Sequence, residues 1–115
     1  MSERQPRPAW YHLHVYFDSQ TLADAQRLRQ QLLEDRLPLA YVGQPIPYAI
    51  GPHPQPMFEL HAPGSHIDLL CARLDALRGN LSVLVHPVQA DELAAHTVDA
   101  RWLGPALPLR LDQLE

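Results

Sequence analysis

The sequence predicts an α+β fold, a ferredoxin-like βαββαβ sandwich in which two helices cover one face of an antiparallel sheet. Two observations lead to this prediction. Short segments alternate apolar and polar residues, as strands do, and two longer segments repeat apolar residues at helical spacing. Along the chain their order is strand, helix, strand, strand, helix, strand. In this topology the first and third strands are central, and the fourth strand lies beside the first.

The composition is that of a folded protein, with 46% apolar and 19% charged residues among 115. This length suits one domain, expected at residues 10–115 after a flexible N-terminal arm at residues 1–9. The single cysteine, Cys71, excludes an intramolecular disulfide. It lies on the apolar stripe of a predicted helix and is interpreted as a core residue.

Charge and hydropathy exclude two classes of partner. The formal net charge is −4, and the nine basic residues are arginines scattered along the chain. Because they form no basic stripe, a nucleic-acid partner is not expected. The chain also shows no signal-like apolar segment at its start and no apolar run of transmembrane length. We therefore expect a cytoplasmic protein with no membrane partner.

The first predicted strand covers residues 10–17, and its two sides separate clearly. One side carries Leu13, Val15 and Phe17, and the other carries His12, His14 and Tyr16. Residues 21–36 then form an amphipathic helix that is expected to begin with a capping box at Thr21. Residues 39–42 form a short strand at the sheet edge.

The segment 43–56 contains five prolines and two glycines, which exclude a helix or a central strand. Long loops in small domains are often functional, and proline stiffening favours that interpretation here. A third strand follows at residues 57–62, and a second helix at 64–79 is expected to be capped by Ser65. The fourth strand covers residues 81–87. A helical turn within 90–100 and a proline-broken tail complete the chain.

The sheet face away from the helices should gather polar residues from three adjacent strands. They are His12 and His14, then Glu59 and His61, and finally His86. Two or three histidines with one carboxylate form the ligand set of a non-haem Fe(II) or Zn(II) site. Alternatively, these residues are simply the polar side of a solvated sheet.

Four segments of this sequence resemble the DOPA 4,5-dioxygenase family, in the family's order. They read YHLHVYFD, GPHPQPMFEL, LSVLVHP and DELAAHTVDARWLG, and the resemblance runs from about Trp10 to Pro108. Fungal members of this family open the catechol ring of DOPA, and many bacterial members have no settled substrate. The resemblance implies a ferredoxin-like domain, usually a homodimer. It also implies Fe(II)-dependent extradiol cleavage, in which O₂ is inserted into a small aromatic catechol substrate.

The resemblance also implies a metal site. The family's His-x-His segment falls on His12 and His14, its strand-three glutamate on Glu59, and its Val-His-Pro segment on His86. The implied cofactor is Fe(II), with Zn(II) an alternative in the isolated protein. Within this set we expect His14, Glu59 and His86 to bind the metal, with His12 competing for a place.

Two more histidines match the family, His53 in the Gly-Pro-His-Pro segment and His96 near the end. Because histidine changes charge near neutral pH, either is a candidate catalytic acid or base. Each also has a structural interpretation, since His53 could bond to loop backbone and His96 could help to end a short helix. Tyr16 and Arg101 are expected substrate contacts, Tyr16 from the site face and Arg101 through a substrate carboxylate.

His61 and His66 match no segment of the family and are interpreted as incidental. Two other functions stay open at this point. One is a non-catalytic dimeric module that binds a small ligand or a metal, because a fold does not assign a function. The other is an iron or zinc hydrolase or isomerase that acts on an aromatic breakdown product. The sequence identifies neither the substrate nor the position of cleavage.

Overall fold

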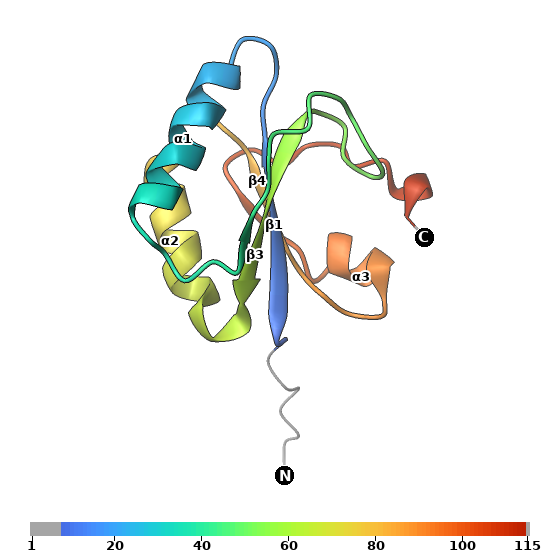
Figure 1. Ribbon diagram of the computed structural model, residues 1–115. Helices are drawn as coiled ribbons and strands as arrows, with labels where there is room; N and C mark the ends of the chain where they lie inside the picture. Colours follow the sequence, from blue (N-terminus) through green and yellow to red (C-terminus); the bar gives the residue numbers. More distant parts are fainter. Residues whose placement is uncertain (1–7, 115) are drawn as a thin grey trace.

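The computed structural model describes residues 8–114, which form a five-stranded antiparallel sheet in the order β2-β3-β1-β4-β5 (Figure 1). The strands are β1 (Trp10–Tyr16), β2 (Tyr41–Val42), β3 (Met57–Pro63), β4 (Val83–Pro87) and β5 (Arg101–Leu103). The predicted topology is confirmed, with β1 between β3 and β4. Strand β5, at the sheet edge, was not predicted from the sequence. Its three residues are too few to show strand alternation.

Helices lie on both faces of the sheet. They are α1 (Leu22–Glu34), α2 (Ile67–Leu77) and α3 (Glu92–His96), with 3₁₀ turns at Gly64–His66 and Leu111–Gln113. Helices α1 and α2 cover one face, and the short α3 lies across the other (Figure 1). Within residues 8–114, no helix is long and apolar enough to span a membrane.

The expected flexible arm, residues 1–9, falls mostly outside the described residues. Its last residue is tied to the domain, because the backbone N–H of Gly64 donates to the carbonyl oxygen of Ala9 at 2.8 Å.

The main core lies between the sheet and helices α1 and α2, as the alternation in the strands predicts. Leu13, Val15 and Phe17 are buried there, and so are Leu60 and Val83 from the two neighbouring strands. Since side chains alternate along a strand, the polar residues between them must face the other side. The core therefore fixes the orientation of every histidine on β1.

The starts of the two long helices differ from the expected capping boxes. No side chain caps α1, because the Thr21 hydroxyl bonds instead within a turn to Asp18. Helix α2 begins at Ile67 rather than next to Ser65, because the chain leaves β3 through a 3₁₀ turn that makes His66 the N-cap residue. The end of α2 agrees with the general rule, since Gly79 follows the C-cap with a φ of 59°.

The sequence predicts helices on one face only, but segments of the same chain cover part of the second face as well. The proline-rich loop (residues 43–56), α3 and the C-terminal segment (residues 104–114) all lie on this side (Figure 1). Beneath them Tyr16, Met57 and Leu84 form a small buried cluster, against which Ile46 and Trp102 pack. The histidines therefore lie in a partly enclosed region rather than on a flat surface.

Candidate functional site

Strand register brings the histidines and Glu59 together. His12 is paired with His61 on β3 and with His86 on β4, and His14 is paired with Glu59. Directly paired side chains on one face of an antiparallel sheet lie about 5 Å apart. Residues separated by many positions in the sequence thus become neighbours.

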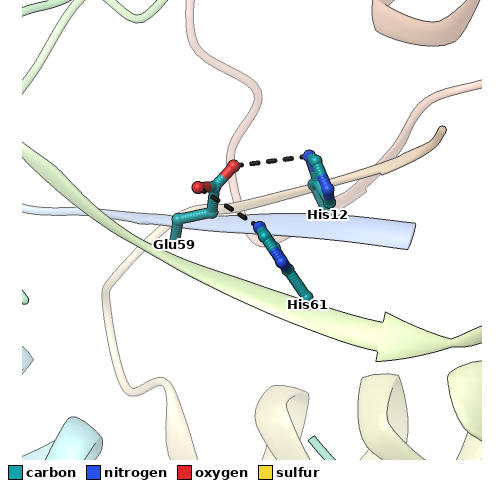
Figure 2. A group of neighbouring side chains, drawn as sticks. All are labelled: His12, Glu59 and His61. Atoms are coloured by element: carbon teal, nitrogen blue, oxygen red, sulfur yellow. Dashed lines mark ion pairs between the residues drawn. The ribbon is translucent and has the colours of Figure 1, made fainter. Parts of the chain in front are cut away.

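The carboxylate of Glu59 faces two imidazoles, those of His12 and His61 (Figure 2). Its Oε1 is 3.4 Å from Nδ1 of His12, and its Oε2 is 3.4 Å from Nε2 of His61. The two imidazole rings stack with their centroids 4.0 Å apart. Among the described residues, this is the group of three whose ligand atoms all lie within 4.8 Å of one another. Burial, together with the neighbouring His61, lowers the pKa of His12.

A second pair of imidazoles, those of His14 and His86, is more deeply buried. Nε2 of His14 is 3.0 Å from Nε2 of His86 and 3.9 Å from Oε1 of Glu59. Burial lowers the pKa of His14 well below its usual value, and the imidazoles of His53 and His86 add to the effect. Nδ1 of His14 is buried, and no hydrogen-bond partner lies within the described part of the chain.

Two histidines direct one ring nitrogen at a backbone carbonyl. Nδ1 of His86 lies 3.1 Å from the Pro87 oxygen, and Nδ1 of His96 lies 2.7 Å from the Glu92 oxygen. Because a carbonyl oxygen only accepts, both Nδ1 atoms carry a proton, and in the neutral form of each imidazole Nε2 is the nitrogen with the lone pair. The two rings are neighbours, with centroids 4.2 Å apart. An imidazole held in this way is suited to bind a metal or to take up a proton.

His53 is hydrogen-bonded both to the sheet, through Tyr16, and to the C-terminal segment, through Arg110. The hydroxyl of Tyr16 lies 2.7 Å from its Nδ1, and its carbonyl oxygen accepts a hydrogen bond of 3.1 Å from Arg110. Burial lowers the pKa of His53 to about 4, and the charges of His96 and Arg110 act in the same direction. The proline-rich loop therefore presents a neutral imidazole to the site near pH 7.

Two hollows border the histidines. One, of about 460 Å³, is lined mainly by four histidines, the proline-rich loop, Glu92 and the end of the C-terminal segment. The other, of about 300 Å³, is apolar and lies over Trp10, Ala40 and Val88, beside His12 and His61. Pockets of this size accept small organic molecules.

The structure shows where the two expected substrate contacts, Tyr16 and Arg101, lie. Tyr16 does face the site side of the sheet, but it is only 1% exposed and its hydroxyl is engaged by His53. Arg101 is paired with Val85 of the main core, so it points to the helix side of the sheet, where it lies 3.7 Å from Asp68 on α2. An arginine on that face is separated by the sheet from the histidines.

His61, which was interpreted from the sequence as incidental, lies in the candidate site. His61 lies against Glu59 and His12, although it matches no segment of the family. Strand periodicity alone placed it on the site face, and the register that pairs it with His12 was the missing information. The other histidine interpreted as incidental, His66, is exposed at the start of α2.

Comparisons with known proteins agree with the fold and the motifs. The model of the Dopa 4,5-dioxygenase family matches residues 11–113. The DOPA 4,5-dioxygenase of Amanita muscaria is 34% identical over 111 residues, which cover 90% of this chain and 49% of the fungal protein. The chain thus spans about half the length of that curated relative.

A solved structure has the same fold. It is the crystal structure of a Nostoc punctiforme protein described as a candidate dioxygenase, which superposes with a TM-score of 0.87 at 33% identity. The superposition covers 96% of this chain and 95% of that protein.

Proposed function

This chain belongs to the Dopa 4,5-dioxygenase family, and on that basis we propose that it is an extradiol-type dioxygenase. It would insert O₂ into a catechol at a non-haem Fe(II) site on the sheet face. The observation that carries this proposal is the carboxylate of Glu59 among histidines from three adjacent strands. Two histidines and one carboxylate are the ligand set of non-haem Fe(II) oxygenases.

The described residues fit such a metal ion, and we propose His12, Glu59 and His61 as its ligands. Their ligand atoms all lie within 4.8 Å of one another. Nε2 of His61 is buried and makes no hydrogen bond within residues 8–114, and it lies 3.4 Å from the Glu59 carboxylate, which fits a nitrogen that shares a metal with this carboxylate. When bound, Fe(II) supplies the redox chemistry that lets a catechol react with O₂.

The set expected from the family, His14, Glu59 and His86, is the competing assignment. Metal–imidazole bonds of about 2.1 Å allow two ligand nitrogens to lie about 3 Å apart. The 3.0 Å between Nε2 of His14 and Nε2 of His86 is therefore compatible with a shared metal as well as with a hydrogen bond. In this arrangement the Nδ1–H of His86 would be held by the Pro87 carbonyl, as is usual for metal-binding histidines.

Variants separate the two assignments by metal content alone. Under our proposal, His61→Ala lowers the affinity for Zn(II) or Fe(II) by at least about a hundredfold, and His86→Ala changes it much less. The opposite pattern would select His14 and His86. Glu59→Gln lowers affinity in either case, and His66→Ala, at an exposed position, is the control.

Two histidines are suited to assist ring cleavage. His96 keeps a lone pair on Nε2, because its Nδ1–H is bonded to the Glu92 carbonyl, and it can take a proton from a catechol hydroxyl. His53, which is neutral near pH 7, lines the same hollow and can donate a hydrogen bond to an oxygen of a bound molecule. The hollow of about 460 Å³ is large enough for one substituted aromatic ring.

The test is an anaerobic preparation loaded with Fe(II) and mixed in air with L-DOPA, caffeate and catechol. L-DOPA is included because the Amanita relative is named for it. A yellow ring-opened semialdehyde that requires Fe(II) is expected. Bound metal without a coloured product would refute ring cleavage of these catechols and favour a hydrolase or isomerase. The absence of both bound metal and coloured product would favour a non-catalytic binding module.

We further propose a homodimer, as the family resemblance implies. Sedimentation velocity at micromolar concentration measures it directly. A monomer at all concentrations would refute the dimer without affecting the proposed chemistry.

A further inference from the structure

Tyr16 is a buried phenol whose one polar group is directed at His53. Its ring packs in the small cluster with Met57 and Leu84, and it also stacks on Trp102 at a centroid distance of 5.9 Å. Its hydroxyl lies 2.7 Å from Nδ1 of His53. The packing fixes the ring on the sheet, so the hydroxyl has a defined position beneath the loop.

The direction of this hydrogen bond follows from the available partners. If Nδ1 of His53 carried the proton, the Tyr16 hydroxyl would have to accept it and find another acceptor for its own proton. Within residues 8–114 the hydroxyl makes its hydrogen bond to His53, and no second one joins it to another residue. A buried donor without an acceptor is unfavourable. The phenol therefore donates, and Nδ1 of His53 accepts.

The main chain of His53 is fixed as well. Its N–H donates to the Ile50 carbonyl at 3.0 Å, and its carbonyl accepts from Arg110 at 3.1 Å. The Arg110 N–H donates to the Pro52 carbonyl at 2.8 Å, which ties the loop to the C-terminal segment. With the backbone and Nδ1 both held, Nε2 is the atom left for a molecule in the adjacent hollow.

We propose that Tyr16 is a positioning residue that holds neutral His53 in the tautomer with its proton on Nε2, so that His53 faces the hollow as a hydrogen-bond donor. His96 is held in the opposite sense, since its Nδ1–H donates to the Glu92 carbonyl and its Nε2 is an acceptor. The two histidines that line one hollow thus have complementary roles, one as donor and one as acceptor. The His53 tautomer is inferred from the hydrogen bond with Tyr16. Only its effect on catalysis rests on the proposed function.

The tautomer is measured by ¹H–¹⁵N correlation spectra of the full chain at pH 7.5, metal-free and loaded with diamagnetic Zn(II). In a neutral imidazole, the unprotonated nitrogen resonates well downfield of the protonated one. The spectrum of the unsubstituted protein should show His53 with a protonated Nε2 and an unprotonated Nδ1. A protonated Nδ1 in this protein would overturn the proposal.

The matched variants are Tyr16→Phe and Tyr48→Phe. Tyr16→Phe keeps the ring packing but removes the donor, so both His53 tautomers should become populated. Tyr48 is 60% exposed on the same loop, and its variant should leave the His53 signals unchanged. His53 signals that stay the same in Tyr16→Phe would show that something else sets the tautomer, and would overturn the positioning role.

The kinetic consequence is measured separately. If the Fe(II)-loaded protein cleaves a catechol, Tyr16→Phe should lower kcat by about tenfold with little change in KM, because a donor is lost in the transition state rather than in binding. An unchanged kcat would overturn the catalytic consequence. If no catechol is cleaved by the unsubstituted protein, the proposed function fails, and the spectra still decide the tautomer.

Discussion

Nε2 of His14 and Nε2 of His86 lie 3.0 Å apart, between the neighbouring strands β1 and β4. Two nitrogens at this distance cannot both carry a proton, because two N–H groups would then point at each other. Burial lowers the pKa of His86 to about 4 and holds the pKa of His14 well below its usual value. The interior of the site is therefore a cluster of neutral imidazoles near pH 7.

This cluster makes metal-free protein sensitive to acid. His53 and His86 have pKa values of about 4 in the folded protein, against 6.5 for an unperturbed histidine. Between pH 6.5 and pH 4 the unfolded chain binds more protons at these groups, so the free energy of unfolding falls as the pH falls. We expect a loss on the order of 2 kcal/mol per imidazole, after allowance for solvent screening in a partly open site.

The measurement is urea denaturation of metal-free protein from pH 7 to pH 4. The double variant His53→Gln and His86→Gln should lose clearly less stability over this range, and His66→Gln should behave like the unsubstituted protein. A double variant with an undiminished loss would show that carboxylates, not these imidazoles, cause the acid sensitivity.

Truncating a side chain in the core beneath the site should lower the free energy of unfolding much more than truncating one on the surface. Leu60 is fully buried on β3, behind Glu59 and His61, whereas Leu69 on α2 is 57% exposed. Leu60→Ala leaves a cavity and should lower the free energy of unfolding by about 2–5 kcal/mol. Leu69→Ala removes the same atoms and should cost less than about 0.5 kcal/mol. Urea denaturation compares them, and equal losses would contradict the assigned strand faces.

Arg101 should be dispensable for any substrate. It lies on the helix side of the sheet near Asp68, and both side chains are largely exposed. Arg101→Ala should leave KM unchanged for catechols with and without a carboxylate, and should change stability by less than about 1 kcal/mol. Steady-state kinetics with caffeate and catechol test this. A KM that rises for caffeate alone would place Arg101 at the substrate after all.

Arg110 should hold the proline-rich loop through its bond to the His53 carbonyl. Arg110→Met keeps much of the side chain but removes this charge-assisted hydrogen bond, which should cost about 1–3 kcal/mol. It also removes a positive charge, so the pKa of His53 should rise above its value of about 4. Denaturation and an NMR titration of His53 measure the two effects.

Arg27→Met is the control for this change, because Arg27 is 71% exposed on α1 and pairs with Asp24. It should affect neither quantity. An unchanged His53 pKa in Arg110→Met would mean that the guanidinium does not act on the imidazole.

Much of the fold and the face of the site could be predicted from local pattern. Alternation in β1 placed His12 and His14 opposite the buried Leu13 and Val15, and the structure agrees. Helical periodicity identified α1 and α2 but placed the start of α2 too early, because the 3₁₀ turn at Gly64–His66 leaves no periodic signal.

Strand periodicity thus decided which side of the sheet each residue faces, since the side-chain repeat along a strand is fixed by covalent geometry. Only the tertiary structure decided which residues meet. The pairing of His61 with His12, the direction of Arg101 and the bond from Tyr16 to His53 depend on strand register and on the path of a long loop. Register and loop path are set by packing between segments far apart in the chain, and no local pattern in the sequence carries that information.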